Sequence, residues 1–208
     1  DPLWRAWVTD LINLKDAGNI TEYTELLNGV VPARFKVGQM IGATGLIMGV
    51  AYAMYRRIDP IRRRDYRSMF ISTALAVFLT GVTEPLEFMF MFCAIPLYIV
   101  YAVLQGLAFA SAGLVDLRLH SFGNIELATR IPMSIRAGLG MDIINFIIAV
   151  IIFFVAGYFV AYYMIGKFGY ATPGREGNYA DTADTIEMDT KNDEHVGAPS
   201  QPERIIAL

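Results

Sequence analysis

The chain has 208 residues, of which 55% are hydrophobic and only 18% are charged, and its net charge is −3. This composition is too apolar for an ordinary soluble domain and is typical of a membrane protein. The single cysteine excludes an intrachain disulfide bond, and no P-loop, paired-cysteine or HExxH motif indicates a nucleotide or metal site. We therefore expect an all-α integral membrane protein without a metal or cofactor.

Residues 1–36 are expected to form a polar, amphipathic entry segment ahead of the membrane part. Asn19, followed three residues later by Glu22, predicts a capped helix start, and Gly29 predicts the end of that short helix. The chain begins with Asp1, and no signal peptide is recognisable, so it is interpreted as a fragment or a processed product.

Residues 37–55 are uncharged and just long enough to cross a bilayer. Glycines recur within them at four- and three-residue spacings, a pattern that lets membrane helices approach closely. These glycines are Gly38, Gly42, Gly45 and Gly49. We expect a packed spanning helix; a flexible apolar loop is the alternative.

Six arginines lie within residues 56–67, directly after this span. Such a cluster beside a membrane segment predicts that this loop lies on the cytoplasmic side. A docking surface for a phosphorylated partner or for anionic lipid is an alternative use of the same charges. No nucleic-acid partner is expected, because no recognisable binding fold accompanies the cluster.

The most informative residues interrupt the apolar stretch 68–115, whose only charged residues are Glu84 and Glu87. Pro85 cannot continue a hydrogen-bonded helix, and Gly81 loosens the backbone just before it. The stretch is thus predicted to be two half-helices with a carboxylate at the break. Broken helices persist at membrane depth only inside protein or beside a watery cavity, where transporters bind substrates. The segment 81–87 is therefore a candidate substrate site.

Each of these acidic residues also has a structural interpretation. Glu84 can serve as a salt-bridge partner, or be protonated and merely tolerated. If Glu84 is the N-cap and Pro85 the first helical residue, Glu87 falls at a capping position near the positive end of the helix dipole. We favour a structural role for Glu87.

Counting the membrane crossings predicts a re-entrant hairpin. If the arginine loop and the polar C-terminal part are both cytoplasmic, the chain between them crosses an even number of times. A hairpin at 68–92, followed by spans at 94–115 and 142–166, satisfies this condition. Residues 171–202 carry no apolar periodicity and are predicted to be a disordered cytoplasmic linker.

Residues 81–88 read GVTEPLEF and resemble the G-[IV]-T-E-P-[IL]-E-F signature of the glucose superfamily of phosphotransferase-system EIIC domains. The likeness extends from about residue 4 to residue 179 and looks closest to the maltose-specific members. Residues 203–208 look like the start of a truncated EIIB domain. The resemblance implies that residues 37–170 are the C-terminal transport half of an elevator-type EIIC, a homodimer in the bacterial inner membrane.

The resemblance also implies a site. Glu84 matches the glutamate that hydrogen-bonds the phosphoryl-accepting hydroxyl of the sugar, so it would orient that hydroxyl and take its proton. Thr83 would line the same turn. Lys36 matches a basic residue of the maltose-type pocket and would donate to sugar hydroxyls or pair with Glu84; a lysine that reaches outward from a helix end is the alternative. The implied partners are the sugar, EIIB with its phosphocysteine, EIIA and the phosphocarrier protein.

Three departures limit the expected activity. The scaffold half is absent, the EIIB cysteine motif is missing, and neither His120 nor His195 stands in the place of the family's upstream histidine. Both histidines are interpreted as structural or solvent-facing, and Cys93 as a packing residue. The expected function is thus one part of a sugar phosphotransferase, with maltose as the substrate. Glucose, N-acetylglucosamine, or a facilitator that releases unmodified sugar are the alternatives.

Overall fold

The computed structural model describes residues 2–29, 31–32, 34–115 and 117–178. Over these ranges the chain is built from helices, and its extended pairing is limited to a bridge between Arg175 and Asn178. The helices are α1 (Pro2–Asp16), α2 (Ile20–Asn28), the 3-10 turn η1 (Arg34–Lys36), α3 (Val37–Ile41), the π-helical turn η2 (Gly42–Leu46), α4 (Ile47–Arg57), α5 (Arg63–Thr80), α6 (Glu84–Met91), α7 (Ile95–Leu114), α8 (Asn124–Arg136) and α9 (Gly140–Phe168). The predicted all-α class is confirmed.

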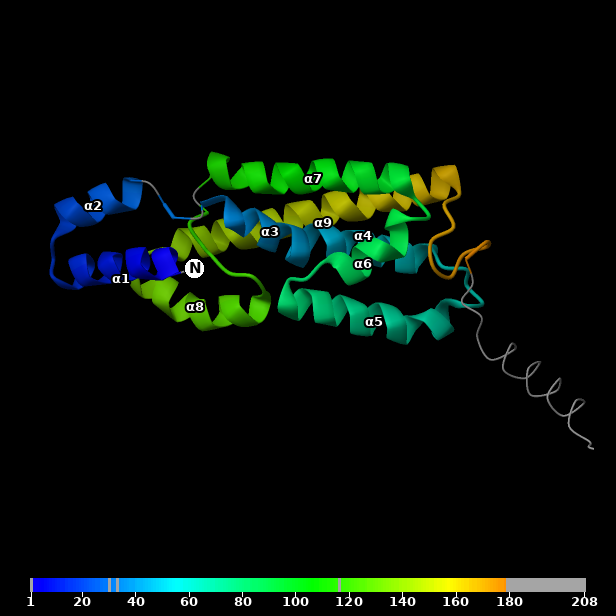
Figure 1. Ribbon diagram of the computed structural model, residues 1–208, viewed down its shortest axis with the longest axis horizontal. Coiled ribbons are helices and arrows are strands. Elements are labelled where there is room, and N and C mark those ends of the chain that lie inside the picture. The colour runs from blue at the N-terminus through cyan, green and yellow to red at the C-terminus, as the bar shows by residue number, and fades with distance from the viewer. Residues whose placement is uncertain (1, 30, 33, 116, 179–208) are drawn as a thin grey trace, which may run out of the picture.

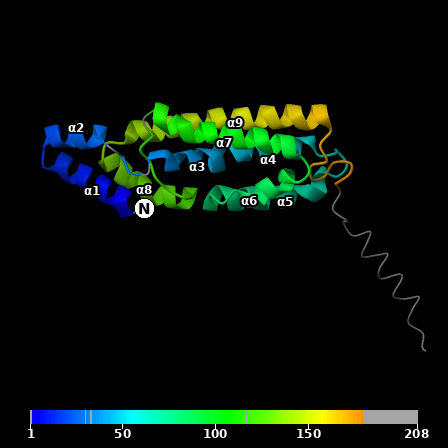
Figure 2. The ribbon, with the colours of Figure 1, turned by 45° about the horizontal axis from the view of Figure 1, so that its top comes forward.

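Three segments of the described chain are long and apolar enough to cross a membrane: Arg34–Arg57, Ile95–Leu114 and Gly140–Phe168. They lie alongside one another in both views (Figures 1 and 2). The first segment, which joins η1, α3, η2 and α4, is mostly buried, whereas α7 and α9 are mostly exposed. The exposed side chains of α7 and α9 include Ile99, Val103, Leu107, Ile144, Ile148, Ile151, Val155 and Phe159. An exposed apolar surface of this extent suits lipid.

The glycines of the central span lie where it touches its neighbours. A Cβ atom at Gly38 would meet the backbone of Phe109 on α7, and one at Gly45 would meet the backbone of Val150 on α9. Only a residue without a side chain permits such an approach. The predicted packed span is therefore confirmed, and the flexible-loop alternative is wrong.

α5 and α6 form a helical hairpin around residues 81–83. α5 runs from the arginine-rich loop toward the middle of the molecule, and α6 turns back toward the same end (Figure 1). Gly81 ends α5 with a φ of +79°, and its N–H donates to the Val77 carbonyl at 2.8 Å. α6 begins at Glu84 with Thr83 at the N-cap, so the prediction of Glu84 as the cap is wrong by one residue.

α8 lies between the predicted spans 94–115 and 142–166, in a part of the chain for which the sequence predicted no helix. It begins in the middle of the molecule, near the end of α5, and runs toward the end that carries α1 and α2 (Figures 1 and 2). Its first residue, Asn124, donates to the Phe78 carbonyl near the end of α5 at 2.7 Å. The chain therefore brings a second turn, residues 117–123, against the α5–α6 turn.

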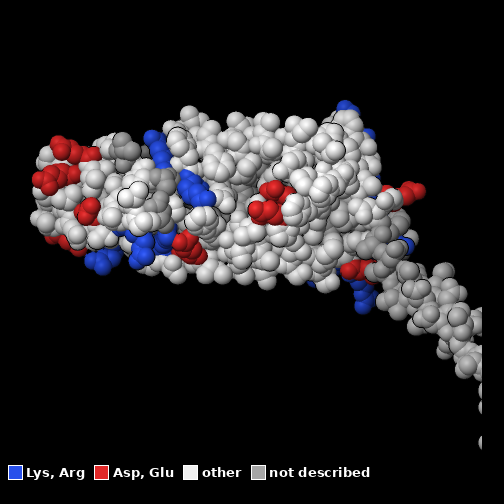
Figure 3. Space-filling view, viewed as in Figure 1, with Lys and Arg blue, Asp and Glu red and all other residues white. Residues whose placement is uncertain are grey.

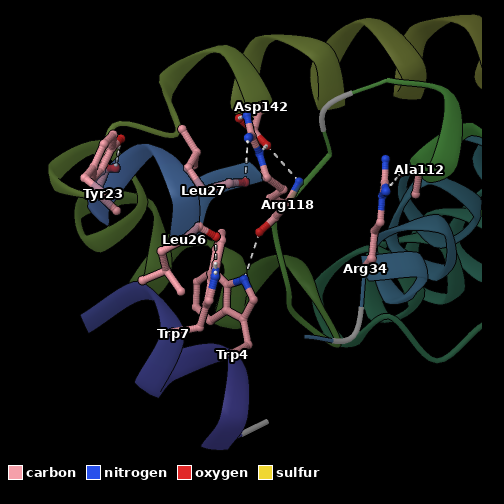
Figure 4. Close-up of polar contacts among 10 residues, drawn as sticks. Trp4, Trp7, Tyr23, Leu26, Leu27, Arg34, Ala112, Arg118 and Asp142 are labelled. Atoms are coloured by element: carbon pink, nitrogen blue, oxygen red, sulfur yellow. Dashed lines mark hydrogen bonds and ion pairs between the residues drawn. The ribbon is translucent and has the colours of Figure 1, made fainter. Parts of the chain in front are cut away.

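A buried ion pair anchors α1 and α2 to the start of α9 (Figure 4). The Arg118 backbone N–H and Nε both donate to Asp142 Oδ1, at 2.8 and 2.9 Å, and Nη2 donates to Oδ2 at 3.0 Å. Arg118 Nη1 also reaches the Leu27 carbonyl at 3.4 Å, while Trp4 Nε1 donates to the Arg118 carbonyl at 2.8 Å. The described parts of the segment 1–36 that form α1 and α2 thus pack against the rest of the molecule.

The predicted start of α2 is correct, but its capping chemistry is not. Asn19 occupies the N-cap position, yet its side chain makes no capping hydrogen bond. Gly29 follows the helix as predicted, in an extended conformation with φ −75° and ψ −162°.

The prediction of a disordered linker from residue 171 is wrong for residues 171–178. The Asp59 N–H donates to the Gly174 carbonyl at 3.2 Å, and Arg175 Nη1 donates to the Ile165 carbonyl at 2.7 Å. Thr172 is fully buried. These contacts fix the segment to the arginine-rich loop and the end of α9; the rest of the predicted linker, 179–202, and the EIIB-like residues 203–208 lie outside the described residues.

Candidate functional site

The candidate site lies where the two turns meet, beside the central span. A Cβ atom at Gly81 would fall on the Phe122 carbonyl oxygen, and one at Gly123 would fall on the Thr80 carbonyl oxygen. The two turns therefore touch backbone to backbone. Asn124 extends this contact to the central span, since its Nδ2 lies 3.0 Å from Thr44 Oγ1 in the π-helical turn η2.

Glu84 is exposed in this chain. Its side chain forms no hydrogen bond or ion pair with any other residue of the described ranges. Figure 3 shows an acidic patch over α6 on a surface that is otherwise mostly uncharged around it, and Glu84 and Glu87 are the acidic residues of that helix. The Glu84 carboxylate is thus available for a ligand, and the alternative of a salt-bridge partner finds no support here.

Glu87 differs from its neighbour because its carboxylate is already engaged. Its Oε1 accepts a hydrogen bond from the Tyr101 hydroxyl at 2.9 Å, and its side chain is half-buried between α6 and α7. The bond joins the short α6 to a spanning helix. This geometry favours the structural role expected for Glu87, although the contact is to Tyr101 and not to the N-terminus of α6.

Thr83 belongs to the α5–α6 turn, whereas Lys36 lies beside the 117–123 turn. Thr83 is half-buried at the N-cap of α6, where its carbonyl accepts the Leu86 and Glu87 N–H groups at 3.1 Å. Lys36 Nζ donates to Gln39 Oε1 and lies 4.1 Å from the centroid of the Phe122 ring. Lys36 therefore adjoins the 117–123 turn, and no ion pair joins it to Glu84 within the described residues.

The 117–123 turn is held in shape by a buried cluster behind it. His120 is buried, and Arg130 Nη1 lies 2.9 Å from His120 Nδ1. Burial of the imidazole, with a smaller contribution from the Arg130 guanidinium, lowers the pKa of His120. A neutral imidazole can accept the arginine N–H at Nδ1, whereas imidazolium cannot. Of the two roles expected for His120, structural or solvent-facing, its burial and its contacts with Arg130 favour the structural one, and His195 lies outside the described residues.

The family is decided by comparison with known proteins. Residues 6–106 match the family model described as "Phosphotransferase system, EIIC". Over all of its 208 residues the chain is 56% identical to the glucose-specific EIICBA component of Streptococcus pneumoniae, and it covers 28% of that protein. Over 144 residues, 69% of the chain, it is 33% identical to the maltose-specific EIICB component of Escherichia coli, and it covers 27% of that protein. This chain belongs to the EIIC family.

As a member of the EIIC family the chain is a membrane protein, in agreement with its three candidate spans. It spans little more than a quarter of the length of these two relatives. The placement nearest the maltose-specific members is not supported, because the identity to the glucose-specific relative is 56% and that to the maltose-specific relative is 33%.

Sequence reasoning missed several residues of the candidate site. Phe122 and Asn124 fall within the wider family resemblance, which extends from about residue 4 to residue 179, but the resemblance assigned them no contact. Thr44 lies between two glycines of the packed span and gave no signal of its own. All three depend on contacts between residues about 40 to 80 positions apart, which periodicity does not reveal.

Proposed function

We propose that this chain is the C-terminal transport part of a membrane subunit that imports and phosphorylates a sugar of the glucose type. The observation that carries the proposal is the Glu84 carboxylate at a helix break, which no described residue pairs with and which lies in a stretch whose only other charged residue is Glu87. A carboxylate in such a position is a functional site by default. The glucose-specific relative, at 56% identity, supports glucose over maltose.

In this proposal Glu84 orients the sugar hydroxyl that accepts the phosphoryl group. That hydroxyl oxygen forms a bond to phosphorus while the bond from phosphorus to the EIIB cysteine sulfur breaks. Glu84 receives the proton of the hydroxyl, and the cysteine leaves as a thiolate. Thr83 lines the turn, and Lys36 donates to other sugar hydroxyls from beside the 117–123 turn. EIIA and the phosphocarrier protein would recharge EIIB.

We also propose that the α5–α6 hairpin enters and leaves the bilayer on the same side, while α7 and α9 cross it. The bond between Asp59 and Gly174 supports this arrangement, because it places the arginine-rich loop and the segment 171–178 at one end of the molecule. By resemblance, residues 37–170 move as the elevator of a homodimer in the bacterial inner membrane. The arginines at that end would face the cytoplasm.

The experiment supplies radiolabelled glucose, maltose and N-acetylglucosamine to membrane vesicles that contain a full-length protein carrying this sequence. Each sugar is tested with phosphorylated EIIB and with unphosphorylated EIIB. We expect donor-dependent sugar phosphate, formed fastest from glucose. Free sugar that accumulates at the same rate with either form of EIIB would contradict the proposal and indicate a facilitator of the same fold. A faster reaction with one of the other sugars would contradict the choice of glucose alone.

A further inference from the structure

The end of α5 depends on a side chain from another element. The last turn of any helix leaves carbonyl groups without intrahelical partners, and such groups are costly away from water. Gly81 N–H satisfies the Val77 carbonyl at 2.8 Å. The Phe78 carbonyl instead accepts a hydrogen bond from Asn124 Nδ2 at 2.7 Å, across a sequence separation of 46 residues. The first residue of α8 therefore completes the last turn of α5.

The same amide is tied to the central span. Asn124 Nδ2 lies 3.0 Å from Thr44 Oγ1, and Thr44 Oγ1 lies 3.3 Å from Asn124 Oδ1. Thr44 belongs to the π-helical turn η2, and π-helical turns inside longer helices are frequent at functional sites. One half-buried amide thus holds α5, α8 and the central span together.

Glu84 has no comparable support of its own. No described residue forms a hydrogen bond or ion pair with its side chain, so its position follows from the backbone of residues 81–83. That backbone is pressed against the 117–123 turn through Gly81 and Gly123. Any movement of one turn relative to the other would therefore displace the Glu84 carboxylate.

We propose that Asn124 is a positioning residue that fixes the Glu84 turn for phosphoryl transfer. The inference rests on the proposed function, because it takes Glu84 as the group that orients the acceptor hydroxyl. A displacement of about 1 Å in a group that aligns reactants lowers rates by roughly 100-fold. Loss of the Asn124 amide should therefore lower kcat more than it weakens sugar binding.

The test compares four variants of the full-length protein with wild type in the EIIB-dependent phosphorylation of glucose. Asn124→Ala removes every amide contact, Asn124→Asp removes the N–H donors at nearly constant volume, and Thr44→Val removes only the bond to the central span. Thr129→Ala is the matched control, since Thr129 Oγ1 bonds only its own helix, at the Glu126 carbonyl. Rates are normalised to folded protein, and the donor-free Kd for glucose is measured separately.

We expect kcat to fall by about 10- to 100-fold in both Asn124 variants, with a smaller fall in Thr44→Val and no change in Thr129→Ala. The Kd for glucose should change less than kcat does. If Asn124→Ala does not fold, Asn124→Asp and Thr44→Val decide the question. A kcat within twofold of wild type in the folded Asn124 variants would overturn the inference while leaving the proposed function intact. Full activity in Glu84→Gln would overturn both.

Discussion

Replacement of Glu84 by glutamine is expected to lower the donor-dependent phosphorylation of sugar by at least about 100-fold, the lower range for loss of a general base. Glutamine keeps the volume of the side chain but cannot take the proton of the acceptor hydroxyl. Because the Glu84 side chain makes no hydrogen bond or ion pair within the described chain, its replacement should leave the fold and the amount of inserted protein unchanged. The initial rate of sugar phosphate formation in vesicles measures the effect.

Glu87→Gln is the matched control for this prediction. It changes the same side chain on the same helix, three residues away, and a glutamine oxygen can still accept the Tyr101 hydroxyl. We expect a rate near that of wild type. Equal losses in the two variants would show that any charge change on α6 is harmful, and would remove the specific role of Glu84. Retention of more than half of the activity in Glu84→Gln would exclude it as the base.

The second large effect is expected at the buried ion pair of Arg118 and Asp142. Asp142 is 1% exposed and accepts hydrogen bonds from three nitrogen atoms of Arg118. Asp142→Ala would leave a guanidinium in a mostly buried position without its counter-ion. Removal of one partner of a buried pair costs about 3 to 5 kcal/mol of unfolding free energy. The midpoint of thermal unfolding of the purified protein in detergent should fall accordingly.

Asp16→Ala supplies the control for an exposed pair. Arg136 Nη2 lies 3.4 Å from Asp16 Oδ2, and both side chains are more than half exposed. Loss of such a pair costs at most about 1 kcal/mol. The double variant Arg118→Met with Asp142→Leu should be more stable than Asp142→Ala, because it leaves no unpaired buried charge. Equal unfolding midpoints for Asp142→Ala and Asp16→Ala would contradict the prediction that the buried pair of Arg118 and Asp142 stabilises the fold more than the exposed pair does.

The membrane helices could be predicted from the sequence because their signals are local. Uncharged stretches of spanning length gave α7 and α9, and the glycine spacing gave the packed central span. The break between α5 and α6 followed from Gly81 and Pro85. The position of the N-cap was wrong by one residue because propensity places an element more reliably than its boundary.

The contacts that build the site could not be predicted, since they join distant parts of the chain. α8 was missed because it contains Pro132, and an internal proline predicts the end of a helix. The polar composition of residues 171–178 predicted a linker, yet Thr172 is buried, and a Cβ atom at Gly174 would meet the side chains of Ile58 and Tyr66. The loop after α4 covers these residues. No pattern within residues 171–178 predicts that contact.

The choice of sugar illustrates a different limit. The segment GVTEPLEF indicates the family because it forms the helix break and carries Glu84, the carboxylate that we propose acts on the acceptor hydroxyl. Any hexose unit presents such a hydroxyl, so these residues carry little information about the rest of the substrate. The preference for maltose over glucose in the sequence interpretation had no support from named contacts, and similarity over the full chain favours glucose.

The most direct test of the central claim asks whether sugar binds at the turn between α5 and α6. Val82 lies in that turn and is 52% exposed. In a full-length protein with Cys93→Ala, the rate at which a thiol reagent labels Val82→Cys is measured with and without saturating glucose. Ala17→Cys, in the exposed turn between α1 and α2, is the control. Glucose should slow labelling at position 82 and leave position 17 unchanged; equal rates with and without glucose at position 82 would contradict the account.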